Sequence, residues 1–512
     1  MNIRSTIAGR DLPRYIPTFY PIVVAVTYLA TLFVGLGISV FSVTRLFAVT
    51  TVAVAATSIA INLVMRDRNR GGVLCLALLF LALFGQDPRI VTVVSCVAAL
   101  VIAERVISFK RPTRVPWRTI TLVGNAVAAI LIVTLITSGV QNGAWGRALE
   151  ELTARRSDMS THSPAAGTPD VFVILLDGYE RPSKMPEVFG FDDSPFTRRL
   201  EQRGFQVASA SRSNYVLTAL SVPSLLNMRH IGDLFQAKPN FDGPLRALVR
   251  SYAADNAVFD QMRHLGYETV SIASGFEEVR IRNADRVIDP GLLNEYEIAM
   301  ARTTGLGRLV NSIAPALLVD AHRNRVLDTL DVAAQQAEKA HDRPLFAFVH
   351  VPSPHGPIVF SSDGEPLSGP GLDKFFADDA HDLGLTREEF GRRYVGQVTY
   401  LNSRVLDMVD RILAASAKPP VIILLSDHGS GSGLDWDDLA HSDLDERSAN
   451  LLATYTPGHP NVFPDNLTLV NLFGTFLGAY FGIDVPTQPD TIYRWDDTLT
   501  HLIKIPDSAI GR

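Results

Sequence analysis

The first 140 residues alternate between long apolar stretches and short polar segments. Apolar stretches with few charged residues lie at 17–37, 45–65, 71–86, 90–107 and 119–140. A helix needs ~20 apolar residues to cross a bilayer, so this pattern predicts five transmembrane helices, of which the third and fourth are the shortest. We therefore expect residues 1–140 to form a five-helix transmembrane domain.

Basic residues are unevenly divided among the segments that connect these stretches. They gather before the first stretch, after the second and between the fourth and fifth, as Arg4, Arg10, Arg14, Arg66, Arg68, Arg70, Arg105, Lys110, Arg111, Arg114 and Arg118. The other two loops have only Arg45 and Arg89 near their edges. The positive-inside rule then places the N-terminus in the cytoplasm and everything after residue 140 outside. The first stretch is longer than a signal-peptide core and lacks a small-x-small cleavage site, so we expect it to be retained.

Beyond the membrane segment the composition becomes that of an ordinary globular domain. Residues 141–168 have the pattern of a juxtamembrane amphipathic helix followed by a Ser/Pro/Thr-rich linker. Short apolar runs predict strands at 170–176, 267–274, 344–351, 420–426 and 450–456. Helical periodicity is found near 194–203, 256–265, 322–340, 387–415 and 468–481. Residues 276–320 have no clear pattern.

Strands that alternate with helices indicate an α/β fold with a mostly parallel sheet covered by helices on both faces. The longest predicted helix, 387–415, begins with Thr386 and Glu389 at the spacing of a capping box. We therefore expect residues 169–512 to form one external domain.

Three predicted strands are followed by a side chain that can bind metal. Asp177 follows the first strand, His355 follows the strand at 344–351, and Asp427 with His428 follows the strand at 420–426. Ligands bind at the carboxyl ends of parallel strands, and Asp with neutral His is a ligand set for zinc or manganese. For a lone Asp-His pair, however, a helix cap and a surface imidazole are the more ordinary interpretation.

A hydroxyl-rich segment follows the first strand, with Thr218, Ser221 and Ser224 at the start of a predicted helix. Backbone N–H groups and the helix dipole at such a position stabilise an anion or an alkoxide. A nearby metal would lower the pKa of the hydroxyl further. The alternative is a Ser/Thr N-cap, the usual reason for these residues at a helix start.

Charge and cysteine content narrow the range of functions. The net charge is -6 with both signs interspersed, which gives no reason to expect nucleic-acid binding. The two cysteines, Cys75 and Cys96, lie inside the predicted membrane spans. The external domain therefore has no disulfide, no cysteine ligand and no cysteine nucleophile.

In combination, these motifs resemble the alkaline-phosphatase superfamily. The matching elements are Asp177, Thr218-Ala-Leu-Ser221-Val-Pro, His355-Gly-Pro, Ser426-Asp427-His428-Gly and His441, thirteen residues after His428. The chain is most similar to the sulfatase-like branch, which includes membrane-anchored phosphoethanolamine and phosphoglycerol transferases. The layout of five spans followed by an external catalytic domain is also similar to that of those transferases.

The resemblance implies a role for each matching residue. It implies that Asp177, Asp427, His428 and Thr218 bind a divalent metal, zinc or manganese, with calcium or magnesium as alternatives. It implies that Thr218 is the nucleophile, and that His355 and His441 bind the substrate phosphate or a second metal.

Two departures from the family pattern bear on these roles. The transferases usually have Glu where this chain has Asp177. Sulfatases convert a Cys or Ser to formylglycine in a pattern that ends in Arg, whereas Leu225 stands at that place here. This favours Thr218, with Ser221 as the alternative nucleophile.

We interpret the protein as a membrane-anchored, metal-dependent phosphotransferase or phosphodiesterase that acts on the outer face of a bacterial cytoplasmic (inner) membrane. Its expected substrate is a phospholipid or a cell-envelope component. The alternatives are a sulfatase-like hydrolase of phosphate or sulfate esters, and a degenerate binding or signalling module that has lost a ligand or the nucleophile. Of the remaining residues, we interpret His350 as a core histidine. Glu180, Arg181 and Arg447 flank the motifs and could contact substrate, but surface salt bridges are the more ordinary interpretation.

Overall fold

A computed structural model describes residues 18–36, 40–109, 115–141, 143–146, 168–236, 245–372, 374–375, 377–436, 438–439, 441–496 and 501–510. The chain divides into two compact units. Unit 1 comprises Met1–Ala154 and Ala299–Ala314, and unit 2 comprises Arg155–Ile298 and Pro315–Arg512. The predicted juxtamembrane helix and linker, 141–168, lie almost entirely outside the described residues.

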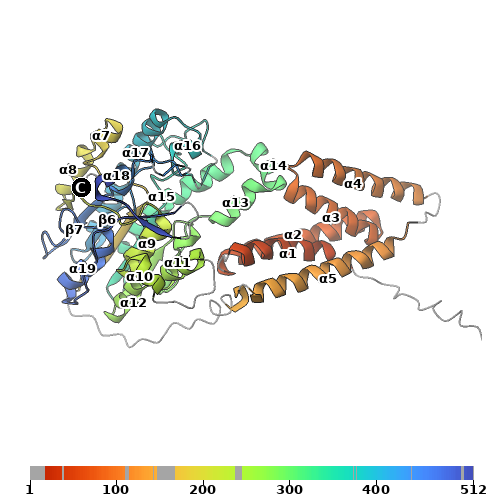
Figure 1. Ribbon diagram of the computed structural model, residues 1–512, viewed down its shortest axis with the longest axis horizontal. Helices are drawn as coiled ribbons and strands as arrows, with labels where there is room; N and C mark the ends of the chain where they lie inside the picture. Colours follow the sequence, from red (N-terminus) through yellow and green to blue (C-terminus); the bar gives the residue numbers. More distant parts are fainter. Residues whose placement is uncertain are drawn as a thin grey trace, which may run out of the picture. The chain divides into compact units, whose positions relative to one another are not determined.

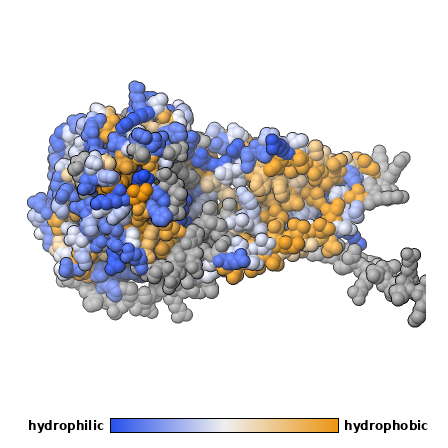
Figure 2. All heavy atoms as spheres, viewed as in Figure 1, coloured by the Kyte–Doolittle hydropathy of each residue, from blue (hydrophilic) through white to orange (hydrophobic). Residues whose placement is uncertain are grey.

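Unit 1 contains a helix at each of the five apolar stretches. The helices are α1 (Tyr20–Leu36), α2 (Val40–Met65), α3 (Arg68–Phe84), α4 (Pro88–Ser108) and α5 (Trp117–Gln141). Among the described residues, three helices are long and apolar enough to cross a membrane: Ser42–Met65 of α2, α4 and α5. The other two are 17 residues long, short of the ~20 that a span needs. Five crossings are therefore not confirmed, although apolar side chains dominate the visible surface of these helices (Figure 2).

A later segment also belongs to unit 1. It contains the nine-residue helix α14 (Gly305–Ile313), which lies against α3 (Figure 1). This segment falls within 276–320, where the sequence shows no clear pattern. Unit 1 is therefore built from the N-terminal helices together with a short helix from the middle of the chain.

Unit 2 is organised around a seven-stranded sheet. The strands are β1 (Val171–Leu176), β2 (Gln206–Val207), β3 (Glu268–Ile272), β4 (Arg286–Ile288), β5 (Leu345–Val351), β6 (Val421–Leu425) and β7 (Leu452–Tyr455), in the order β2-β7-β6-β1-β5-β3-β4. The pairs from β6 to β4 are parallel, and β7 is antiparallel to both of its neighbours. This confirms the predicted mostly parallel sheet. A separate hairpin joins β8 (Tyr493–Trp495) to β9 (Leu502–Lys504).

Successive residues of the central strand β1 belong to two different cores. Phe172, Ile174 and Leu176 pack in one core, whereas Val171, Val173 and Leu175 pack in the other. Strand side chains alternate between the two faces of a sheet, so a strand that is buried on both faces is apolar throughout. This accounts for the unbroken apolar runs that predict the strands.

Helices cover both faces of the sheet (Figure 1). The long helices α15 (Ala316–Glu338) and α17 (Arg387–Ala415) pack in the first core. The helices α9 (Thr218–Asn227), α12 (Ala257–His264) and α19 (Leu472–Phe481) pack in the second. The bounds of α17 coincide with the predicted 387–415, and the Thr386 side chain accepts a hydrogen bond from the Glu389 backbone N–H, as predicted for its N-cap.

Shorter elements complete unit 2. The helices are α7 (Met185–Phe189), α8 (Ser194–Glu201), α10 (Ile231–Gln236), α11 (Leu245–Ala254), α13 (Glu295–Thr303), α16 (Ala380–Leu383) and α18 (Leu444–Ser448), the last residues of α13 being in unit 1. Single 3-10 turns lie at Glu277–Val279, Leu469–Asn471 and Asp507–Ile510.

Candidate metal centre and nucleophile

The candidate site begins where the two central strands end. Asp177 follows the last residue of β1, and Asp427 lies two residues after β6, which pairs in parallel with β1. Gly178 turns the chain with a φ of 71°, a backbone conformation that strongly favours glycine, and its N–H donates to Asp427 Oδ1 at 3.2 Å. The turn after β1 therefore fixes one carboxylate against the other.

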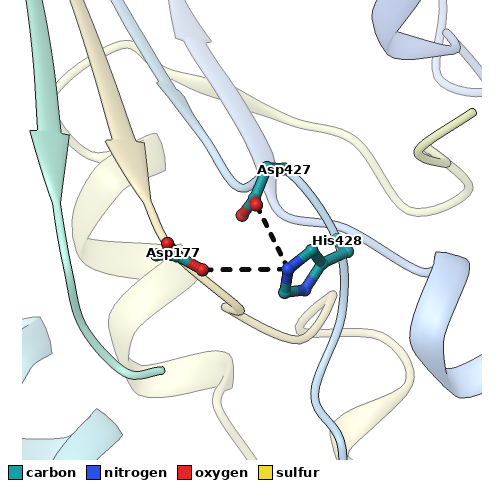
Figure 3. A group of neighbouring side chains, drawn as sticks. All are labelled: Asp177, Asp427 and His428. Carbon is teal, nitrogen blue, oxygen red and sulfur yellow. Dashed lines mark ion pairs between the residues drawn. The ribbon is translucent and has the colours of Figure 1, made fainter. Parts of the chain in front are cut away.

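Asp177, Asp427 and His428 converge on one point (Figure 3). One ligand atom from each lies within 4.8 Å of the other two, and all three residues are buried. Asp177 Oδ1 and Asp427 Oδ2 are buried oxygens that accept no hydrogen bond. Buried carboxylate oxygens are normally hydrogen-bonded or bound to a cation, so this donor set fits a divalent metal.

The His428 ring is held in the tautomer that a metal needs. Its Nδ1 lies 2.9 Å from the carbonyl oxygen of Gly429, which can only accept, so Nδ1 carries the proton and Nε2 has the free lone pair. Burial lowers the pKa of His428, and the positive charge of Arg447 lowers it further. The imidazole is therefore neutral, which is the form that binds metal.

Thr218 is the hydroxyl residue nearest to this cluster. It is the first residue of α9, is 4% exposed, and its Oγ1 lies 3.0 Å from His428 Nε2. The residue at the N-cap position is Leu217, so no side chain caps this helix end. Thr218 is thus not the N-cap of α9, and its hydroxyl points at the candidate metal ligands instead.

Ser221, the alternative nucleophile, is engaged elsewhere. Its Oγ donates to the carbonyl oxygen of Asp427 at 2.8 Å and lies 3.1 Å from Ser213 Oγ. These bonds tie α9 to the segment after β6. Ser221 therefore supports the wall of the site, whereas Thr218 faces the cluster.

His355 lies beside the cluster, but its ring makes different contacts. Its Nδ1–H donates to the Gly356 carbonyl at 2.8 Å, and its Nε2 is 3.8 Å from Asp378 Oδ2. Burial opposes protonation of His355, but the carboxylates of Asp177 and Asp378 raise its pKa above the ordinary value. The raised pKa favours the imidazolium form of His355, in which Nε2 also carries a proton next to the candidate metal centre.

His441 is not brought to this group. Its side chain is 84% exposed, and its Nδ1 lies 2.8 Å from Asp438 Oδ2 on the same loop. Thirteen residues separate His441 from His428, but the intervening loop turns the imidazole into solvent. A role for His441 at the substrate phosphate or a second metal stays a prediction that its position does not favour.

Arg447 lies beside His428, and the interpretation of this residue as part of a surface salt bridge is wrong. Its guanidinium is buried, donates to the Val216 carbonyl at 2.8 Å and lies 3.2 Å from His428 Nε2. It also forms an ion pair with buried Asp378. Burial alone would raise the pKa of Asp378, but Arg447 and the imidazoles lower it to about 2. Arg447 is thus a buried cation at the site and not a surface salt bridge.

Glu180 and His350 also differ from their predicted surroundings. Glu180 is fully buried and accepts from the Ser430 N–H at 2.9 Å, so it is no surface ion-pair residue. His350 is buried, as expected for a core histidine, but its Nε2 lies 3.0 Å from Asp177 Oδ2. Burial would raise the pKa of Asp177, but His355 and His350 lower it below its ordinary value. His350 therefore orients a candidate ligand carboxylate.

The mostly parallel sheet covered by helices gives an α/β domain of the alkaline-phosphatase type. A sulfatase family model matches residues 169–474, more than half of the chain. The chain belongs to the sulfatase family, and it is a sulfatase-like hydrolase or transferase. No curated protein sequence matches it.

Solved structures of several bacterial proteins have a similar fold. The C-terminal periplasmic domain of EptC from Escherichia coli, in complex with zinc, has a TM-score of 0.44 and 13% identity, and the match covers 68% of this chain and 94% of that one. The soluble domain of lipooligosaccharide phosphoethanolamine transferase A from Neisseria meningitidis has a TM-score of 0.40 and 15% identity, with 63% and 91% covered. The integral membrane form of the same Neisseria protein has a TM-score of 0.40 and 14% identity, with 90% and 94% covered.

Proposed function

We propose that this protein is a membrane-anchored, metal-dependent phosphotransferase or phosphodiesterase that uses Thr218 as its nucleophile. The observation that carries the proposal is the position of the Thr218 hydroxyl. It lies at the N-terminus of α9, 3.0 Å from His428 Nε2, beside a cluster with two buried carboxylate oxygens that accept no hydrogen bond.

Asp177, Asp427, His428 and Thr218 would hold the metal, and the mixed oxygen and nitrogen set suits zinc or manganese. When bound, the metal would lower the pKa of the Thr218 hydroxyl and neutralise charge on a phosphate ester. The N-terminus of α9 adds its partial positive charge at the same place. A threonine hydroxyl in this position is ready to act as a nucleophile.

The reaction consists of two displacements at phosphorus. In the first, the bond from Thr218 Oγ1 to phosphorus forms while the bond from phosphorus to the donor alcohol breaks. The Thr218 proton leaves to solvent, and His355 Nε2–H protonates the departing alkoxide. In the second, an acceptor hydroxyl or water attacks the phosphothreonine and gives its proton to His355, while the bond from phosphorus to Thr218 Oγ1 breaks and the Thr218 alkoxide regains a proton from solvent. The guanidinium of Arg447 stabilises the charge that develops on the phosphoryl oxygens.

The substrate is proposed to be a phosphate ester carried by a lipid. Three helices among the described residues that precede the catalytic domain are long and apolar enough to cross a membrane, which supports a site tethered to a bilayer. Three crossings and five crossings are both odd numbers. In either case the catalytic domain is on the side of the membrane opposite to the N-terminus. Basic residues around α4 and α5 then favour an extracytoplasmic catalytic domain at the inner membrane, with α1 and α3 as the fourth and fifth spans.

The second candidate is a hydrolase of soluble phosphate or sulfate esters. It shares the metal centre and differs only in the acceptor, which would be water. A sulfatase with a formylglycine at Ser221 is disfavoured, because the Ser221 hydroxyl is hydrogen-bonded to the Asp427 backbone carbonyl and to Ser213, whereas the Thr218 hydroxyl contacts His428.

Turnover of a head-group-labelled phospholipid by the full-length protein in vesicles separates these functions. A transferase moves the labelled head-group phosphate to an acceptor and releases diacylglycerol. Free head-group phosphate with no transferred product would reject transfer in favour of hydrolysis. Turnover of neither phosphate nor sulfate esters, in a metal-loaded protein, would indicate a binding module instead.

A further inference from the structure

Helix α14 has one face covered by exposed apolar side chains. Leu306, Leu309, Val310 and Ile313 are 55%, 55%, 41% and 76% exposed. At the 100° per residue of an α-helix these four positions fall within an arc of about 100°. Arg308 is exposed on the opposite side of the helix. The helix is therefore amphipathic, and its apolar side is largely exposed.

This apolar face is unusual for the part of the chain that follows the membrane helices. Among the described residues after 146, the other exposed large apolar side chains are Val287, Leu292, Leu317 and Ile503. Half of such residues thus lie within one nine-residue helix. Concentrated apolar exposure of this kind marks an interaction surface.

The start of α14 is held against the membrane helices by close backbone contact. A Cβ placed on Gly305 would lie 2.4 Å from the Leu81 carbonyl oxygen and 2.8 Å from the Gly85 Cα, so no side chain fits there. Gly85 lies three residues before Pro88, the first residue of the candidate span α4. The contact therefore fixes α14 at the level where a transmembrane helix begins.

The course of the chain places this level on the same side of the membrane as the segment that leads to the catalytic domain. If α4 and α5 both cross the bilayer, the start of α4 and the end of α5 at Gln141 emerge on the same face. The segment that leads to the catalytic domain follows Gln141, and α14 is attached at the start of α4. Both lie on one side of the membrane, whichever way the protein is oriented.

We infer that α14 is a membrane-surface helix that inserts Leu306, Leu309, Val310 and Ile313 into the lipid leaflet facing the catalytic domain. Its sequence fits that environment, because an interfacial helix has an apolar face toward the acyl chains and a basic residue, here Arg308, toward the head groups. The family assignment does not supply this helix face. The inference is independent of the proposed reaction.

Spin labelling of the full-length protein in liposomes of phosphatidylethanolamine and phosphatidylglycerol tests the inference. Cys75 and Cys96 are replaced by Ala, and a single cysteine is introduced by Leu309→Cys, Ile313→Cys or, as the matched control on the polar face, Arg308→Cys. Collision of the nitroxide with oxygen, which concentrates in lipid, is compared with collision with a water-soluble nickel chelate. The protein in which both native cysteines are replaced and no cysteine is introduced gives the background from nonspecific labelling.

The expected result is preferential collision with oxygen at 309 and 313 and with the nickel chelate at 308. Preferential collision with the nickel chelate at all three positions would overturn the inference, because the apolar face would then be in water. Dipolar broadening between labels at 313 on different copies would overturn it as well, in favour of a dimer contact. Both outcomes are independent of whether the protein turns over any ester.

Discussion

At the residue scale, the candidate site depends on which hydroxyl faces the metal ligands. Thr218 Oγ1 lies against His428, whereas Ser221 Oγ donates to the Asp427 carbonyl. Sequence alone leaves both residues open as nucleophiles, because a helix start presents hydroxyls at several positions. The direction of each hydroxyl depends on the segment after β6, which comes more than 200 residues later.

Substitution of these hydroxyls separates their roles. Thr218→Ala is expected to lower kcat by roughly three orders of magnitude or more, because a nucleophile is removed. Thr218→Ser retains the hydroxyl and part of the activity. In the Ser221→Ala variant, we expect the phosphoryl adduct to form on Thr218 as in the wild type. Mass spectrometry of the Thr218 peptide after the reaction is quenched during turnover detects this adduct. An adduct on Ser221 in the wild type would reverse the assignment.

Arg447 shows what the sequence could not indicate about a single residue. Its partners, Val216 and Asp378, come from distant loops, so no local pattern marks its burial. Removing one member of a buried ion pair leaves an uncompensated charge and costs about 3–5 kcal/mol.

A double substitution tests whether this pair is coupled. Arg447→Met is expected to lower the unfolding temperature strongly, and Arg447→Met with Asp378→Asn to recover much of that loss. Thermal unfolding of the four proteins of the cycle measures the coupling. If the loss in the double variant equals the sum of the losses in the two single variants, the pair does not contribute to stability as a unit.

At the element scale, the sheet was predictable and the irregular segments were not. Strands buried on both faces leave unbroken apolar runs, and the parallel-sheet rule places Asp177 and Asp427 at one edge. The long helix α17 has a cap and a continuous apolar stripe, so its bounds were predictable too. Elements of two to nine residues, such as β4 and α14, are too short to produce a periodic signal.

Helix α17 also supports the turn that carries Asp177. The Tyr394 hydroxyl accepts from the Glu180 N–H and donates to the Gly178 carbonyl, both at 2.8 Å. Tyr394→Phe leaves two buried backbone groups without partners, which costs about 1–3 kcal/mol each. We expect a lower unfolding temperature and weaker metal binding by titration. Tyr400→Phe on the same helix is the matched control, and equal effects in both variants would contradict this role.

The membrane-facing helix α14 leads to a prediction about substrate access. Leu309→Asp combined with Ile313→Asp is expected to reduce turnover of a vesicle lipid while leaving turnover of a soluble aryl phosphodiester unchanged, because only the lipid must be reached at the bilayer. Arg308→Asp is the control for added negative charge. Equal loss with both substrates would mean that α14 supports folding and not lipid access.

At the scale of the whole molecule, the chain combines a membrane unit with a sulfatase-family domain. Hydrophobic patterning predicted this division because apolar helices and buried strands differ in length. Patterning did not predict that Ala299–Ala314 returns to the membrane unit, since that segment is short and lies far along the chain. The number of crossings beyond three rests on helices of 17 residues, near the limit that a bilayer requires.

The central claim is that Asp177, Asp427 and His428 hold a metal beside Thr218. Its most direct test is the metal content of the purified full-length protein, measured for the wild type, Asp427→Asn and the exposed-loop control Asp438→Asn. We predict stoichiometric zinc or manganese in the wild type and in Asp438→Asn, and loss of the metal in Asp427→Asn. A wild type without bound metal, or the same metal content in Asp427→Asn, would contradict the account.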